Sequence, residues 1–141
     1  MKKIYFFNLM LLLLVSFTSF SQNRSAYIEP REERNITQIS FTEESIILNN
    51  ETAYKYERQG DSFIIKTMED IDLIKGKITN VGYNEFESLI IFLKLNKKFT
   101  NSKITGRNDL IFALADFNVF KRDLTMDEDK LTEFIALYNE L

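Results

Sequence analysis

The sequence contains neither cysteine nor histidine among its 141 residues. Without cysteine there are no disulfides, no thiol nucleophiles and no attachment point for a bacterial lipid anchor. Without histidine there is no Ser-His-Asp triad, no imidazole acid–base catalysis and none of the usual zinc or copper ligand sets. The composition therefore predicts a protein that is not an enzyme and has no catalytic residue, no cofactor and no metal site.

Glycine is almost as scarce, and the sequence has four scattered residues of this type: Gly60, Gly76, Gly82 and Gly106. They form neither a dinucleotide-binding fingerprint nor a phosphate-binding loop. The acidic segment 123–134 also fails the EF-hand calcium pattern. Glu128 stands where that loop needs glycine, and Phe134 stands where it needs a bidentate acid.

No Lys/Arg-rich run occurs either, and the chain has 18 basic residues against 21 acidic ones. Its net charge of −3 becomes more negative once the two lysines of the predicted leader are removed. An acidic protein without a basic stripe is a poor match for the phosphate backbone of nucleic acids and for anionic membrane surfaces. We therefore expect no nucleic-acid partner.

The N-terminus has the three regions of a secretory leader. Two lysines precede an apolar run over residues 4–15, and a more polar segment over residues 16–21 follows. Ser19 and Ser21 place small side chains before a cut at Gln22, as signal peptidase requires. Residues 1–21 are predicted to be a signal peptide, which sends the protein to the periplasm or outside the cell without a stable membrane anchor after cleavage.

The apolar stretch also permits an alternative, because residues 4–20 just reach the roughly 17 residues that a membrane span needs. An uncleaved anchor is therefore the competing interpretation. Residues 22–36 contain Pro30 and a mixed-charge run, and we predict a flexible N-terminal tether there. Residues 37–141 are predicted to form a single domain.

Residues 37–105 alternate between apolar and polar side chains, which is the pattern of half-buried strands. Turn signals interrupt the alternation at Asn49-Asn50 and at Gln59-Gly60-Asp61. Short polar turns between strands favour an antiparallel β-meander of five or six strands. The most apolar segment, residues 86–95, is predicted to be a central strand buried on both faces, with a helix as the alternative.

The spacing changes after the strands. Apolar residues recur at three- and four-residue steps over residues 110–117, which predicts a helix capped by Asn108 or Asp109. A second helix is predicted towards the C-terminus, with Thr125 and Glu128 as a capping box. Strands followed by helices indicate an α+β fold in which the two C-terminal helices pack with the meander.

Tyr54 and Tyr56 lie two residues apart and therefore share one face of a predicted strand. Core packing is the ordinary role of such residues. If helices leave that face uncovered, Tyr54, Tyr56 and Phe63 form an exposed aromatic face for a partner or a ligand. If the sheet is curved, Phe86 and Phe92 join them in lining a ligand cavity.

The turn at residues 59–61, the strand at residues 72–78 and the closing amphipathic helix around residues 127–138 are similar to those of small secreted domains of unknown function from Bacteroidota. The leader, which ends Ser19-Phe20-Ser21-Gln22, resembles the leaders of that group. The resemblance implies an exported protein with a β-meander followed by C-terminal helices. It implies no activity and supplies no site residues.

These observations lead to one main functional hypothesis and two alternatives. The main hypothesis is an exported, non-enzymatic binding or interaction module whose partner is a protein or a small apolar ligand. The first alternative is a small-ligand or lipid carrier built on a curved sheet, which predicts an apolar cavity between sheet and helices. The second is an immunity-type inhibitor of a bacterial toxin, which agrees with a small, acidic, exported domain.

Overall fold

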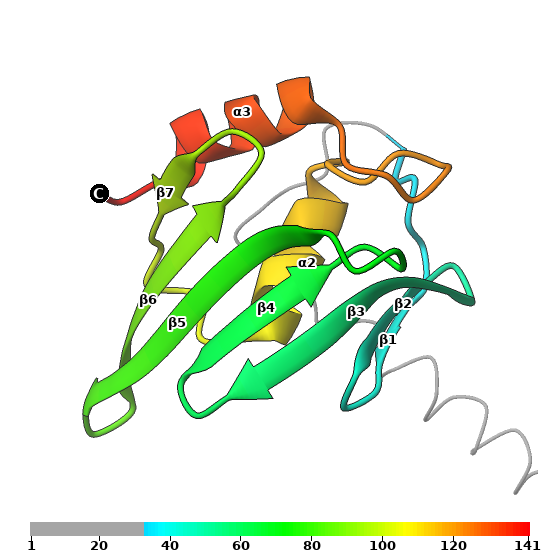
Figure 1. Cartoon of the computed structure of the whole chain (residues 1–141). Coiled ribbons are helices and arrows are strands. Elements are labelled where there is room, and N and C mark those ends of the chain that lie inside the picture. The colour runs from blue at the N-terminus through cyan, green and yellow to red at the C-terminus, as the bar shows by residue number, and fades with distance from the viewer. Residues whose placement is uncertain (1–32) are drawn as a thin grey trace, which may run out of the picture.

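The computed structural model describes residues 33–141, so the predicted signal peptide and residues 22–32 of the predicted tether lie outside it. The described chain forms an antiparallel sheet followed by two helices (Figure 1). The strands are β1 (Ile39–Phe41), β2 (Ser45–Leu48), β3 (Glu51–Gln59), β4 (Ser62–Lys66), β5 (Asp72–Gly82), β6 (Glu85–Phe92) and β7 (Lys97–Phe99). The helices are α2 (Arg107–Asp116) and α3 (Glu128–Tyr138).

Each strand pairs with the next one along the chain, and the sheet order is β1-β2-β3-β4-β5-β6-β7. The predicted α+β meander with two C-terminal helices is therefore confirmed. The sheet has seven strands instead of five or six. The two edge strands, β1 and β7, have three residues each, which is too short for a visible alternation in the sequence.

One face of the sheet is buried and the other faces solvent. On β6, Ile90 and Phe92 are fully buried, whereas Leu89 between the inward positions is 38% exposed. The prediction that residues 86–95 are buried on both faces is therefore wrong. An antiparallel meander has no crossover helices to cover its second face, so apolar residues there stay partly exposed.

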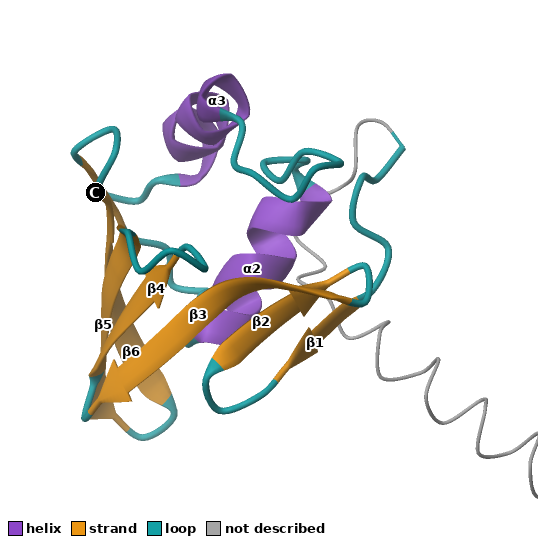
Figure 2. Ribbon diagram, turned by 45° about the vertical axis from the view of Figure 1, so that its right-hand side comes forward, coloured by secondary structure: helices purple, strands orange, loops and turns teal. Residues whose placement is uncertain are grey.

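Helix α2 lies against the concave face of the curved sheet (Figure 2). Its apolar residues cover most of its circumference, and Leu110, Ile111 and Leu114 are completely buried. The sheet covers one side of the helix. Ile36, just before β1, is also fully buried in the same hydrophobic core.

The segment before β1 is part of the folded domain. The backbone N–H of Asn35 donates to Oδ1 of Asn118 at 2.9 Å, and its side-chain amide donates to the carbonyl of Phe120 at 3.0 Å. Nε of Arg34 lies 3.4 Å from a carboxylate oxygen of Asp116. Residues 34–36 are therefore wrongly assigned to the tether, because a single apolar residue such as Ile36 gives no periodic signal.

Helix α3 begins at a different cap from the predicted one. The side chain of Asp127 accepts hydrogen bonds from the backbone N–H groups of Asp129 and Lys130 at 3.0 and 3.1 Å. Thr125 instead donates its hydroxyl to Asp123 at 2.6 Å. The capping box of Thr125 with Glu128 is therefore not formed, and Asp127 satisfies the free donors of the first turn.

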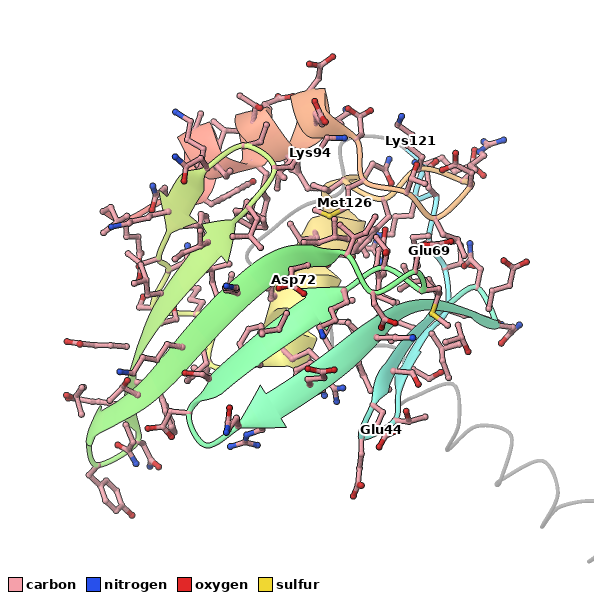
Figure 3. All side chains as sticks on the ribbon, viewed as in Figure 1. Glu44, Glu69, Asp72, Lys94, Lys121 and Met126 are labelled. Atoms are coloured by element: carbon pink, nitrogen blue, oxygen red, sulfur yellow. The ribbon has the colours of Figure 1, made fainter. Side chains whose placement is uncertain are left out.

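The sheet has two distinct ends. The turns β1–β2, β3–β4 and β5–β6 lie at one end of the sheet, which we call the hairpin end. The three other turns lie at the opposite end, which we call the α3 end because α3 and the loop before it lie on that side (Figure 1). Glu44 marks the hairpin end, whereas Lys94 and Met126 mark the α3 end (Figure 3).

The chain after α3 runs along the edge strand β7. The backbone N–H of Glu140 donates to the carbonyl of Thr100 at 2.8 Å. The side chain of Asn139 accepts from the N–H of Thr100 at 3.0 Å and donates to the carbonyl of Lys98 at 3.2 Å. Backbone groups at this edge of the sheet thus have partners within the same chain.

Candidate functional site

A cavity of about 470 Å³ lies at the hairpin end, between strands β3 to β6 and the first turn of α2. We call it the hairpin-end cavity. Its lining combines aromatic and aliphatic side chains with charged and amide groups. The lining residues are Tyr56, Arg58, Asp61, Phe63, Ile78, Asn80, Phe86, Thr105, Gly106, Arg107, Asn108 and Asp109.

The apolar wall of the hairpin-end cavity comes from four successive strands. Tyr56, Phe63, Ile78 and Phe86 lie on β3, β4, β5 and β6 in that order. The rings of Tyr56 and Phe63 have centroids 5.8 Å apart and are tilted against each other. The alternation of each strand thus brings one large apolar side chain to the same inner surface.

The guanidinium of Arg107 is held between two aromatic rings. Its Cζ lies 4.0 Å from the ring centroid of Tyr56 and 4.7 Å from that of Phe41, within the range of cation–π contact. Nη1 donates to the carbonyl of Thr42 at 2.8 Å, and Nε donates to Oδ1 of Asn108 at 3.1 Å. Burial lowers the pKa of Arg107, and a weaker electrostatic effect of Tyr56 opposes this shift.

Arg58 reaches the same cavity from the end of β3. Its Nε donates to the carbonyl of Gly60 at 3.0 Å, in the tight turn that joins β3 to β4. Gly60 has φ of 62°, a left-handed conformation that glycine adopts without steric cost. The turn therefore fixes one side of the Arg58 guanidinium.

The first turn of α2 closes the cavity on the helix side. Gly106 occupies the N-cap position, and no side chain caps the helix there. Asp109 instead points back and accepts from the N–H of Thr105 at 3.0 Å and from its hydroxyl at 2.8 Å. The predicted caps, Asn108 and Asp109, are therefore wrong, because both lie inside the helix.

A second, smaller cavity of about 180 Å³ lies at the α3 end. We call it the α3-end cavity, and its lining is mainly apolar. Its lining residues are Tyr54, Thr67, Leu73, Phe92, Lys94, Leu95, Thr125, Met126, Glu128 and Leu131. Figure 3 shows Lys94 and Met126 at this end. Nζ of Lys94 and a carboxylate oxygen of Glu128 lie 2.6 Å apart, so an ion pair spans two lining residues.

Tyr54 is anchored in the core beside the α3-end cavity. Its side chain is 5% exposed, and its hydroxyl donates to the carbonyl of Leu124. Burial raises the pKa of the Tyr54 phenol, and the negative charge of Asp123 adds to the shift. Tyr54 therefore stays neutral and acts as a hydrogen-bond donor that fixes the loop between α2 and α3.

The predicted aromatic residues divide between the two cavities. Tyr56 and Phe63 line the hairpin-end cavity together with Phe86, whereas Tyr54 and Phe92 line the α3-end cavity. Phe63 is only 4% exposed, like Tyr54, because the helices and their loops cover this side of the sheet. These aromatic side chains thus divide between two cavities that are partly open to solvent, instead of forming one patch.

The two arginines of the hairpin-end cavity were not among the residues predicted from the sequence. Arg58 follows Tyr54 and Tyr56 on the same strand face, and Arg107 precedes the first apolar residue of α2. Alternation places Arg58 on the inner face, and this was the available signal. No sequence pattern around Arg107 indicates that it lines the same cavity as Arg58, because their proximity depends on how α2 packs against the sheet.

The described part of the chain holds no group of three or more acidic side chains that can bind a metal ion. No helix within residues 33–141 is long and apolar enough to cross a membrane. No protein-family model, curated protein or solved structure matches this chain.

Proposed function

We propose that this protein is an exported, non-enzymatic binding module that holds one small molecule in the hairpin-end cavity. The observation that carries the proposal is the cavity itself. Its volume of about 470 Å³ falls within the range of roughly 300–1,000 Å³ that is usual for small-molecule sites. Seven of its twelve lining residues are polar or charged, and these groups can orient a molecule that packs against the apolar wall.

This proposal keeps the binding module of the main hypothesis and takes from the carrier alternative a small ligand held between sheet and helix. An interaction module that uses an aromatic face needs that face to be open, and Tyr54 and Phe63 are buried. The α3-end cavity is less suitable, since its volume of about 180 Å³ is below the usual range. No feature of residues 33–141 specifically supports a toxin inhibitor.

The export part of the proposal depends on the leader. The expected product begins at Gln22 and is found in the periplasmic or extracellular fraction. Intact mass analysis of the protein from separated cell fractions tests this expectation. A cytosolic protein that retains Met1 and both N-terminal lysines contradicts export.

The binding part is tested by native mass spectrometry on protein isolated from its own host. We expect a population whose mass exceeds that of the processed polypeptide by one small molecule. Mild activation in the gas phase should release this molecule and leave the bare polypeptide. If the spectra show the unliganded polypeptide alone over a range of gentle ionisation conditions, the proposal is contradicted.

A matched pair of variants locates the bound molecule. Ile78→Trp enlarges a half-buried side chain of the cavity wall and should displace the ligand. Ile64→Trp makes the same change at a half-buried position of β4 outside the cavity lining and should leave the ligand in place. Equal retention by both variants would contradict binding in the hairpin-end cavity.

A further inference from the structure

The two arginines that line the hairpin-end cavity have only neutral hydrogen-bond acceptors. Arg58 donates to the carbonyl of Gly60, and Arg107 donates to the carbonyl of Thr42 and to the Asn108 amide. Within the described residues neither guanidinium forms an ion pair with a carboxylate. The cavity lining therefore contains two positive charges, Arg58 on β3 and Arg107 on α2, and no carboxylate of the described residues forms an ion pair with either.

The surroundings of Arg107 restrict how it can meet a ligand. The rings of Phe41 and Tyr56 lie within 5 Å of its Cζ, at 4.7 and 4.0 Å, and hold the guanidinium in place. Its remaining N–H groups lie in the guanidinium plane, whose fork matches the two oxygens of a carboxylate. The lowered pKa of Arg107 reflects partial desolvation of this cation, which an anion in the cavity offsets.

Two acidic residues limit the charge of that anion. Asp61 and Asp109 also line the cavity, and the Asp109 carboxylate accepts hydrogen bonds from the N–H and the hydroxyl of Thr105. With two arginines and two carboxylates, the lining has no net charge. A ligand with one negative charge is therefore repelled less by Asp61 and Asp109 than a doubly charged phosphate is.

We infer, on the basis of the proposed function, that the ligand is an organic carboxylate with one negative charge and an apolar or aromatic body. Its carboxylate binds Arg107 and Arg58. Its body packs against the cavity wall that contains Phe63 and Phe86. One molecule would then contact both parts of the lining, the aromatic wall and the two arginines that form no ion pair within residues 33–141.

A pair of isosteric probes tests the charge requirement. The full chain is expressed, purified in its processed form and titrated with 4-phenylbutyrate and with its neutral amide, with ¹H–¹⁵N NMR and calorimetry as readouts. The acid should shift resonances of residues around the cavity. It should bind roughly tenfold more tightly than the amide, since a hydrogen bond to a charged group contributes more to the binding free energy than one between neutral groups. Its affinity should fall as the ionic strength rises.

Arginine variants connect this preference to the two side chains. Arg107→Gln and Arg58→Gln should weaken binding of the acid and reduce its advantage over the amide. Arg107→Lys keeps the charge without the planar fork and should have an intermediate effect. Arg122→Gln is the matched control, since Arg122 is an exposed arginine outside the lining of either cavity. Circular dichroism melting curves confirm that each variant remains folded.

The outcomes separate this inference from the proposed function. Equal binding of acid and amide, or tighter binding of phenethyl phosphate, overturns the carboxylate assignment and leaves small-molecule binding intact. A ligand released from the native protein supports the assignment if it is an organic acid and overturns it if it is neutral. If no probe binds and the native protein has only its bare mass, the proposed function itself fails.

Discussion

The ring of Phe63 on β4 lies across the α-carbon of Gly76, its cross-strand neighbour on β5. A methyl group added to Gly76 would lie 2.2 Å from Cζ of that ring, far inside van der Waals contact. The glycine is therefore required by the close approach of the ring and not by a turn. Phe63 also forms part of the hairpin-end cavity wall, so this contact sets the shape of the candidate site.

Gly76→Ala should destabilise the protein by about 1–3 kcal/mol, because the buried ring must move to admit the methyl group. Urea unfolding measures the change. Gly106→Ala serves as the control, since no atom lies within 4 Å of the added methyl group, and should cost less than about 1 kcal/mol. Adding Phe63→Leu to Gly76→Ala should recover part of the loss, and strict additivity of the two changes would contradict the clash.

Tyr54→Phe should destabilise the protein by about 1–2 kcal/mol. The change leaves the carbonyl of Leu124 without the buried phenol that donates to it. Thermal unfolding followed by circular dichroism measures the effect. Tyr56→Phe is the matched control, because no hydrogen bond to its hydroxyl is formed within residues 33–141, and we expect almost no change. Equal effects at both positions would argue against a role for the Leu124 bond.

Asp127→Ala should cost about 1 kcal/mol through loss of the α3 cap. Thr125→Ala removes only an exposed hydrogen bond to Asp123 and should cost less. The urea concentrations at the midpoints of unfolding of the two variants show which substitution destabilises the protein more. A larger loss for Thr125→Ala would instead support the capping box that the sequence predicted.

The hydrogen bond and charge of Lys55 hold the pKa of the Asp70 carboxyl below its ordinary value. Because the folded-state pKa is the lower one, the pair contributes fully to stability above a pH of about 4, the ordinary pKa of aspartate. The contribution is lost as the pH falls through the folded-state pKa. Lys55→Met should raise the Asp70 pKa towards its ordinary value, as measured by an NMR titration of the side-chain carboxyl.

Lys75→Met is the control for that titration. Lys75 is an exposed lysine on β5 with no ion pair in the described structure, and its removal should leave the Asp70 pKa unchanged. A similar pKa shift in both variants would mean that general surface charge, and not the contact with Lys55, perturbs Asp70.

The fold was largely predictable because its signals are local. Tyr54 and Tyr56 alternate with the polar residues Lys55 and Glu57 on β3. Such periodicity identifies strands and helices wherever they are long enough. It fails for three-residue edge strands and for Ile36, whose burial depends on contacts with distant parts of the chain.

The candidate site was predictable only in part. Tyr56 and Phe63 follow from the face pattern of their strands, but Arg58 and Arg107 meet only after α2 packs against the sheet. Helix starts show the same limit. Several polar residues near Asp127 can cap a helix, and bonds formed in the folded loop decide which of them does.

The hydrogen bonds that Asn139 and Glu140 make beside β7 have a consequence for self-association. A bare strand edge is a template on which another polypeptide can extend the sheet, and such growth leads to fibrils. On this side the template is already occupied by the chain's own backbone and amide groups. Asn139→Ala removes the side-chain hydrogen bonds to Thr100 and Lys98. The variant should therefore aggregate more than its small loss of folding stability alone would cause.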